Sequence, residues 1–125
     1  MKKIISTTNA PAAIGPYSQA IEINNMIYTS GVIPINPEDS TLVTGDIKVQ
    51  ADRVLKSLSD LLEAAGTSLD KVIKTTVFIK NMEDFAAMNE VYASYFTSNC
   101  PARSCVEVAR LPKDVLIEIE AIAYR

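Results

Sequence analysis

The chain has 125 residues, a formal net charge of −3 and 48% hydrophobic residues. A chain of this length fits one domain, and its hydrophobic content is sufficient for a buried core. No apolar run approaches the roughly 20 residues that a membrane-spanning helix needs, and no secretory hydrophobic segment follows Met1-Lys2-Lys3. We therefore expect a single cytoplasmic domain over residues 1–125, with no membrane partner.

The chain contains no histidine, and its two cysteines are Cys100 and Cys105. This composition lacks the commonest general base and the commonest metal ligand, so we expect no metal and no other cofactor. An odd offset along an extended segment points the two cysteines to opposite faces, which argues against a disulfide between them. Lysines and arginines are scattered rather than gathered into a basic patch, so nucleic acid is not an expected partner.

Short strands and turns are predicted for the N-terminal third. The expected elements are a strand at residues 4–5, a loop over 7–16, strands over 18–23 and 26–33, and a loop over 34–45. Asn24 and Asn25 separate the second and third strands, and asparagine tolerates the left-handed backbone of a tight turn. These two strands should therefore form a hairpin.

The clearest helix is predicted over residues 46–65, where apolar residues recur at the helical period. Asp46 can cap its start, and Gly66 can supply the left-handed residue at its end. The remaining expected elements are a strand over 72–79, a helix over about 82–96 capped by Asn81, and strands over 103–109 and 115–124.

This order predicts an α+β fold in which a mixed six-stranded sheet carries both helices on one face. The other face of the sheet then needs a partner. The last predicted strand has one purely apolar side, while its other side mixes Glu118 and Glu120 with Ile122 and Tyr124. Neither side is an ordinary solvent face, which indicates a subunit interface.

Two residues are candidates for a binding site because of where they fall in the pattern. Asn89 lies on the apolar side of the second helix, where a buried amide costs about 1–3 kcal/mol without hydrogen bonds. Arg103 shares a strand face with Cys105 and Glu107, and its planar fork matches a carboxylate. The structural alternatives are a core asparagine satisfied by a neighbour and an arginine paired with a nearby glutamate, and both are common.

Three further features allow a functional interpretation. Glu118 and Glu120 are carboxylates in an otherwise apolar strand. A position near the substrate explains them about as well as a solvated edge or interface salt bridges. Two turns of small residues, Gly15-Pro16-Tyr17-Ser18 and Thr29-Ser30-Gly31, allow close backbone approach to a ligand. Segments of this composition are usually only turns.

Taken together, these segments resemble the reactive intermediate deaminases, the RidA branch of the YjgF/RidA family. The resemblance covers essentially the whole chain, and its most specific part is the Arg103 segment followed by Leu111-Pro112-Lys113 and the Glu118 strand. It implies a chorismate-mutase-like fold, assembled as a homotrimer with sites between subunits. It also implies hydrolysis of 2-aminoacrylate, 2-iminopropanoate and 2-iminobutanoate to 2-oxo acids and ammonia.

The resemblance assigns roles to individual residues. Arg103 would bind the substrate carboxylate, and Glu118 would hold or activate the attacking water. The remaining predicted pocket residues are Tyr17, Ser30, Gly31, Asn89 and the backbone of Cys105. One departure is Val32, where many relatives have glutamine, and this change affects a polar contact near the pocket mouth.

Three rival functions remain open. Some relatives are described as endoribonucleases or translation inhibitors, but the acidic balance of this chain disfavours RNA binding. A non-catalytic protein that binds 2-oxo acids would use the same pocket. A chaperone would depend on exposed apolar surface rather than on Arg103.

Overall fold

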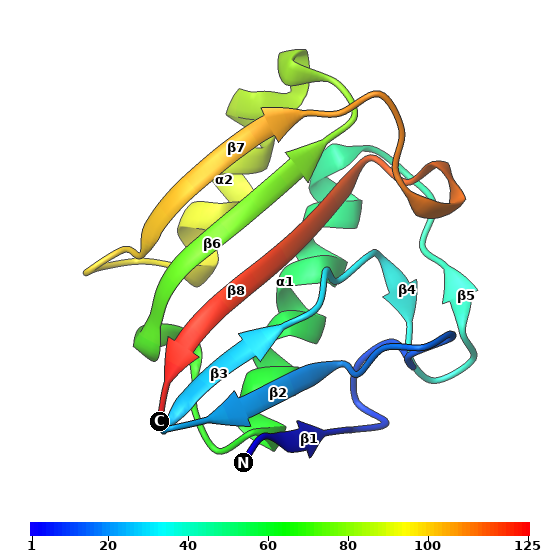
Figure 1. Ribbon diagram of the computed structural model, residues 1–125. Coiled ribbons are helices and arrows are strands. Elements are labelled where there is room, and N and C mark those ends of the chain that lie inside the picture. The colour runs from blue at the N-terminus through cyan, green and yellow to red at the C-terminus, as the bar shows by residue number, and fades with distance from the viewer.

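A six-stranded sheet carries both helices on one face in the computed structural model, which describes residues 1–125 (Figure 1). Its strands are β1 (Lys3–Ile5), β2 (Ala20–Ile23), β3 (Met26–Thr29), β6 (Val72–Ile79), β7 (Ala102–Glu107) and β8 (Ile117–Tyr124). They lie side by side in the order β1-β2-β3-β8-β6-β7. The β6–β7 pair is parallel and the other pairs are antiparallel. The predicted α+β class and mixed sheet are confirmed.

Helix α1 (Ile47–Ala64) forms where the apolar period predicts it. Asp46 caps its start by accepting a hydrogen bond from the Val49 backbone N–H at 3.1 Å. The helix ends before Gly66, whose φ of +84° is strained for a residue with a side chain. The buried side of α1 packs on the sheet, and no helix of the protein combines the length and hydropathy that crossing a membrane would need.

Helix α2 (Phe85–Tyr95) is shorter than the predicted segment. Its first expected turn is instead a 3₁₀ helix, η2 (Met82–Asp84), which Asn81 caps by accepting from the Glu83 N–H at 2.9 Å. The Glu107 carboxylate accepts from the Met82 N–H at 2.8 Å and so fixes this turn to the end of β7. This side-chain bond to the first turn has no counterpart in the hydrophobic period, which is why the sequence predicted one continuous helix.

A small hairpin lies within the segment that was predicted as a loop. Its strands are β4 (Ile35–Asn36) and β5 (Thr41–Leu42), and they form a separate two-stranded sheet. Asp39 and Ser40 make the turn between them: the Asp39 carboxylate accepts from the Thr41 N–H at 3.0 Å, and Ser40 has a φ of +62°. Two-residue strands carry no readable alternation, so the pattern could not reveal them.

Several predicted strand boundaries were also wrong, and β2 and β8 each begin two residues later than predicted, at Ala20 and Ile117. Strand β3 stops at Thr29, although the chain meets β8 again where Val32 and Ile119 exchange both backbone hydrogen bonds. Strand β7 stops at Glu107 rather than Ala109, because its partner β6 ends at Ile79, the register neighbour of Glu107. A short 3₁₀ turn, η3 (Pro112–Asp114), then leads into β8, and the other short turn, η1 (Leu69–Lys71), precedes β6.

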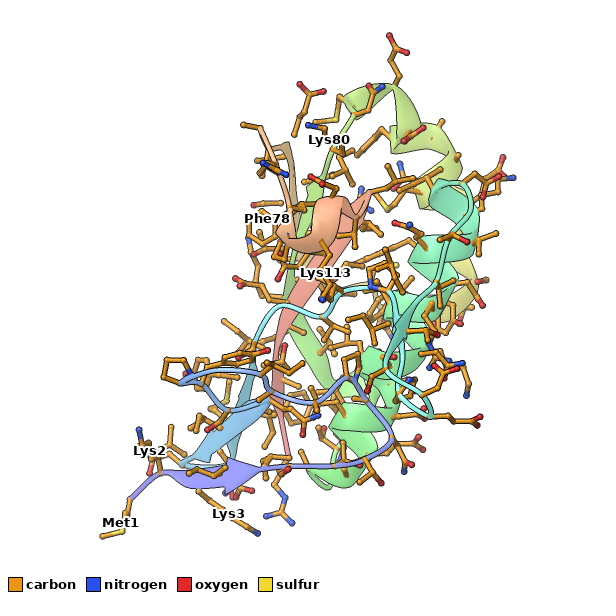
Figure 2. The ribbon with its side chains drawn as sticks, turned by 90° about the vertical axis from the view of Figure 1, so that its right-hand side faces the viewer. Met1, Lys2, Lys3, Phe78, Lys80 and Lys113 are labelled. Atoms are coloured by element: carbon orange, nitrogen blue, oxygen red, sulfur yellow. The ribbon has the colours of Figure 1, made fainter.

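The two faces of the sheet differ in their cover. On the helix side, Val77 and Ile119 are fully buried against α1 and α2. On the other side, Tyr28, Val106 and Tyr124 are more than 40% exposed. Figure 2 views the sheet edge-on and shows Phe78 on the side away from the helices. The open face is therefore rich in apolar side chains with nothing from this chain over them, as the sequence predicted.

Candidate active site

A cavity of about 510 Å³ opens beside the end of β3. Four of the predicted site residues line it: Tyr17, Ser30, Gly31 and Glu118. Its walls come from the segment between β1 and β2, the segment between β3 and β4, the η3 turn and β8. Most of the remaining lining is apolar, so the few polar groups in it can fix the orientation of a small ligand.

Gln19 organises the segment that forms one wall of this cavity. The side chain is 6% exposed, and its amide oxygen accepts from the Thr7 N–H at 2.7 Å. Its amide nitrogen donates to the carbonyls of Thr7, Ala10 and Pro11 at 3.1, 3.3 and 2.7 Å. One side chain thus satisfies backbone groups of a loop that has no strand to pair with. No pattern in the sequence indicates this role for Gln19.

Glu118 is the principal ionisable group of the cavity. Burial raises the pKa of the Glu118 carboxyl above its ordinary value, and the neighbouring charge of Glu120 raises it further. The carboxylate lies directly against Gly31, where a β-carbon would come within 2.0 Å of Oε2. A carboxyl with a raised pKa beside an open cavity is suited to proton transfer near neutral pH.

Ser30 and Tyr17 contribute to the cavity mainly through its shape. The Ser30 hydroxyl donates to the Ser18 carbonyl at 2.6 Å, and its backbone N–H donates to Gln19 at 2.9 Å. This hydroxyl proton is therefore already engaged within the chain. Tyr17 is 52% exposed and accepts from the Ile14 N–H at 3.4 Å, so its ring stands at the cavity mouth.

Arg103 lies away from this cavity, on the edge strand β7 and against helix α2. Its Nη1 donates to the Asn89 side-chain oxygen at 2.7 Å. Its guanidinium carbon lies over the rings of Tyr92 and Phe85, at 4.7 and 5.4 Å from their centroids. Arg103 forms no ion pair within the chain, so the alternative of an arginine paired with a neighbouring glutamate is wrong. Its positive charge remains available to an anionic ligand.

Cys105 lies two residues after Arg103 on the same face of β7, in register with Val77 of β6. Burial raises the pKa of its thiol, and the Arg103 charge offsets this only in part. The side chain is therefore a protonated thiol at neutral pH rather than a nucleophilic thiolate. Cys100 is exposed and free, and its thiol contacts the Phe96 carbonyl.

The register of the sheet separates the predicted site residues into two groups. Arg103 pairs with Thr75, which in turn pairs with Ala121, so these three side chains share the helix side of the sheet. Glu118 is an odd number of residues from Ala121 and therefore points to the opposite side. Within one chain, Arg103, Asn89 and Cys105 form one group, and Tyr17, Ser30, Gly31 and Glu118 form the other.

Val32 and Lys113 line the cavity, although the sequence did not predict a place in the site for either side chain. Val32 is 6% exposed, and its side chain belongs to the hydrophobic core while also lining the cavity. Lys113 also lines the cavity, and Figure 2 shows it in η3 beside the segment that leads from β3 to β4. Its left-handed backbone, with φ of +56°, could not be read from the sequence.

The sequence matches the family described as Endoribonuclease L-PSP over residues 7–125. It is 54% identical to 2-iminobutanoate/2-iminopropanoate deaminase of Escherichia coli K12, over 100% of this chain and 99% of that protein. The crystal structure of a protein of unknown function of the conserved Rid family from Yersinia pestis superposes with a TM-score of 0.97 at 52% identity, with 100% of both chains covered. TdcF of Escherichia coli, solved with bound serine, superposes with a TM-score of 0.94 at 48% identity, covering 98% of each chain. The chain therefore belongs to the Endoribonuclease L-PSP family and, within it, to the Rid proteins.

Proposed function

We propose that this protein hydrolyses short enamine and imine acids, among them 2-aminoacrylate, 2-iminopropanoate and 2-iminobutanoate, to 2-oxo acids and ammonia. The observation that carries the proposal is the Arg103 guanidinium, which is held by Asn89 and two aromatic rings and has no carboxylate partner in the chain. Such a group is ready to take the carboxylate of a small acid. The relative that is 54% identical over the full chain has this activity in its name, and TdcF was solved with the amino acid serine bound.

The proposed reaction needs few catalytic groups from the protein. The carbon of a protonated imine is already electrophilic, so water can add to it once the acid is held in place. Arg103 binds the carboxylate, and Glu118 takes a proton from the attacking water. The same carboxyl then returns that proton to the nitrogen, and the C–N bond breaks as the hydroxyl oxygen forms the C=O bond of the 2-oxo acid. The carboxylate takes the hydroxyl proton that is released in this step and passes it to the departing ammonia. The raised pKa of Glu118 suits both steps, because the group exchanges protons closer to neutrality.

We also propose that the working form is a homotrimer whose sites lie between subunits. Arg103 and Glu118 point to opposite sides of one sheet, so a site that uses both needs a second copy of the chain. The open sheet face, with exposed Tyr28, Val106 and Tyr124, offers the apolar surface for that contact. Light scattering should give three chains per particle at micromolar concentration. A monomer that still hydrolyses imines would contradict this assembly.

A direct assay separates the proposed reaction from its rivals. 2-Iminobutanoate is generated in the cuvette and ammonia release is followed with and without the protein. The same preparation is incubated with RNA and with an aggregating test protein. Accelerated ammonia release without RNA cleavage supports the deaminase. RNA cleavage or suppressed aggregation with no effect on the imine would replace it with the endoribonuclease or chaperone function. Binding of 2-oxobutanoate without turnover would leave a 2-oxo acid-binding protein.

A cytoplasmic site of action fits this proposal. Both cysteines are free, and the exposed Cys100 suits a reducing compartment. Fractionation of cells with an antibody against the protein tests this location.

A further inference from the structure

Three residues of helix α2 hold the guanidinium of Arg103. Phe85, Asn89 and Tyr92 recur at the spacing that places side chains on one helix face. Phe85 and Tyr92 present their rings to the guanidinium carbon, and Asn89 accepts a hydrogen bond from Nη1. Nε and Nη2 of Arg103 make no hydrogen bond within the chain. The helix therefore fixes one part of the fork and leaves the other part for a ligand.

A buried hydrogen bond to β6 holds the Tyr92 side chain in place. Its hydroxyl is 2.7 Å from the Thr75 hydroxyl, and the two side chains are 7% and 0% exposed. Thr75 is also the register neighbour of Arg103 across the β6–β7 pair. Contacts among Arg103, Tyr92 and Thr75 thus connect β7, α2 and β6. A change in the χ1 rotamer of Tyr92 would move its hydroxyl and break this buried hydrogen bond.

We propose that Tyr92 is a positioning residue for the imine hydrolysis, and that Thr75 acts through it. This inference rests on the proposed function, because it assumes that Arg103 binds the substrate carboxylate. The ring supports the guanidinium in the orientation that presents its two free nitrogens together. Cation–π support is stronger here than on a surface, because the ring is buried. Burial also raises the pKa of the Tyr92 phenol, so its hydrogen bond to Thr75 persists at neutral pH.

A positioning role has a kinetic signature. The contact between Arg103 and the carboxylate exists both in the bound substrate and in the transition state. Loosening Arg103 therefore raises KM and leaves kcat nearly unchanged. A purely structural role for Tyr92 would lower the melting temperature and leave KM of the folded molecules as it was.

The chain offers a matched control one turn along the same helix. The Tyr95 hydroxyl donates to the Asp52 carboxylate at 2.7 Å, on the side of α2 that faces α1. Tyr95→Phe therefore removes the same kind of hydrogen bond without touching Arg103. It should change the melting temperature and leave KM unaltered.

The experiment compares Tyr92→Phe, Thr75→Val, the double variant and Tyr92→Leu with Tyr95→Phe and the unchanged protein. KM and kcat are measured with 2-iminobutanoate, the dissociation constant with 2-oxobutanoate by calorimetry, and the melting temperature by scanning calorimetry. We expect KM and the dissociation constant to rise about 2- to 10-fold in Tyr92→Phe and Thr75→Val. The double variant should show less than the product of the two effects, since one hydrogen bond is lost in each case. Tyr92→Leu, which also loses the ring, should show about a 3- to 30-fold rise.

Unchanged KM and dissociation constants in folded Tyr92→Phe, Thr75→Val and Tyr92→Leu overturn the inference. Should Tyr92→Leu fail to fold, the two conservative variants decide alone. The dissociation constant for 2-oxobutanoate tests this inference independently of the proposed reaction. If the protein binds 2-oxobutanoate but releases no ammonia, the hydrolysis proposal fails and the dissociation constants still test Tyr92. If it neither binds the oxo acid nor hydrolyses the imine, both proposals fail.

Discussion

The Glu118 carboxylate lies so close to Gly31 that a β-carbon at residue 31 would come within 2.0 Å of Oε2 and 2.6 Å of the carboxyl carbon. Glycine is therefore needed at this position for the space its missing side chain leaves. Its φ is not in the left-handed region, so backbone conformation is not the reason. The small-residue turn after β3 and the carboxylate of β8 form one structural unit of the cavity.

Gly31→Ala should displace Glu118 and slow catalysis while the fold persists, because the clashing atoms belong to the far end of a flexible side chain. Correctly placed general acid–base groups contribute about 10²–10⁴-fold, so we expect kcat to fall by at least about tenfold. Steady-state kinetics in the Glu118→Gln background supply the control. If Gly31→Ala slows that background as much as it slows the unchanged protein, the effect does not pass through Glu118.

The neighbouring charge of Glu120 predicts a pH effect. The pKa of Glu118 is raised first by burial and then by Glu120. If ionised Glu118 is the base, kcat/KM rises with pH through this raised pKa. Glu120→Gln removes one cause of the shift, so the acid limb of the profile should move to lower pH. A profile whose acid limb stays in place, or moves to higher pH, would contradict the assignment.

The raised pKa of Glu118 also affects the free energy of unfolding. A carboxyl whose pKa is higher in the folded state than in the unfolded state favours folding while it is protonated. This contribution is present below the ordinary glutamate pKa and is lost as the pH rises through the folded-state value. Glu118→Gln should therefore raise the melting temperature at neutral pH relative to the unchanged protein, and the difference should shrink in acid. Scanning calorimetry across this pH range measures it.

The sequence predicted the larger elements because their patterns are long. The 18 residues of α1 contain five turns of an apolar period, and β8 alternates over its full length. The β4–β5 hairpin was not predicted, because each of its strands has only two residues. The role of Gln19 was not predicted for a different reason. Its side chain makes four hydrogen bonds to loop backbone, and their partners are known only once the loop is folded.

The site itself was predicted residue by residue but not in its arrangement. Whether Arg103 and Glu118 lie on the same face of the sheet depends on the register of β6 with both β7 and β8. Register follows from tertiary packing, and a slip of one residue reverses every side chain. The contact of Arg103 with Phe85 and Tyr92 likewise could not be predicted without knowing the distance between α2 and β7. The spacing of these aromatic residues around Asn89 was visible in the sequence.

The Cys105 thiol should be dispensable. Burial raises its pKa and the chain has no histidine to remove its proton. Cys105→Ser should therefore keep kcat/KM within about threefold of the unchanged protein. Cys100→Ser, which alters the exposed thiol, is the matched control. A folded Cys105→Ser protein without turnover would instead favour covalent catalysis.

Arg103→Ala should give the largest loss of any single substitution. It removes a charge-assisted contact to the substrate carboxylate that is worth on the order of 2–5 kcal/mol. This corresponds to a loss of about 30-fold to several-thousand-fold in kcat/KM, since about 1.4 kcal/mol equals one decade. Arg103→Lys should recover only part of the loss, because an ammonium keeps the charge but not the planar fork.

The fold should tolerate Arg103→Ala, because Arg103 has no carboxylate partner that the change would leave buried and unpaired. Lys48→Ala controls for charge: it removes one exposed cation that pairs with Glu90 on the helix side, far from β7 in the sequence. Melting temperature, particle mass and imine hydrolysis are measured on the same samples. We expect Lys48→Ala to keep full activity and Arg103→Ala to stay folded and oligomeric while losing kcat/KM through a raised KM. A folded Arg103→Ala protein with near-normal kcat/KM would refute the carboxylate-binding role on which the proposed mechanism depends.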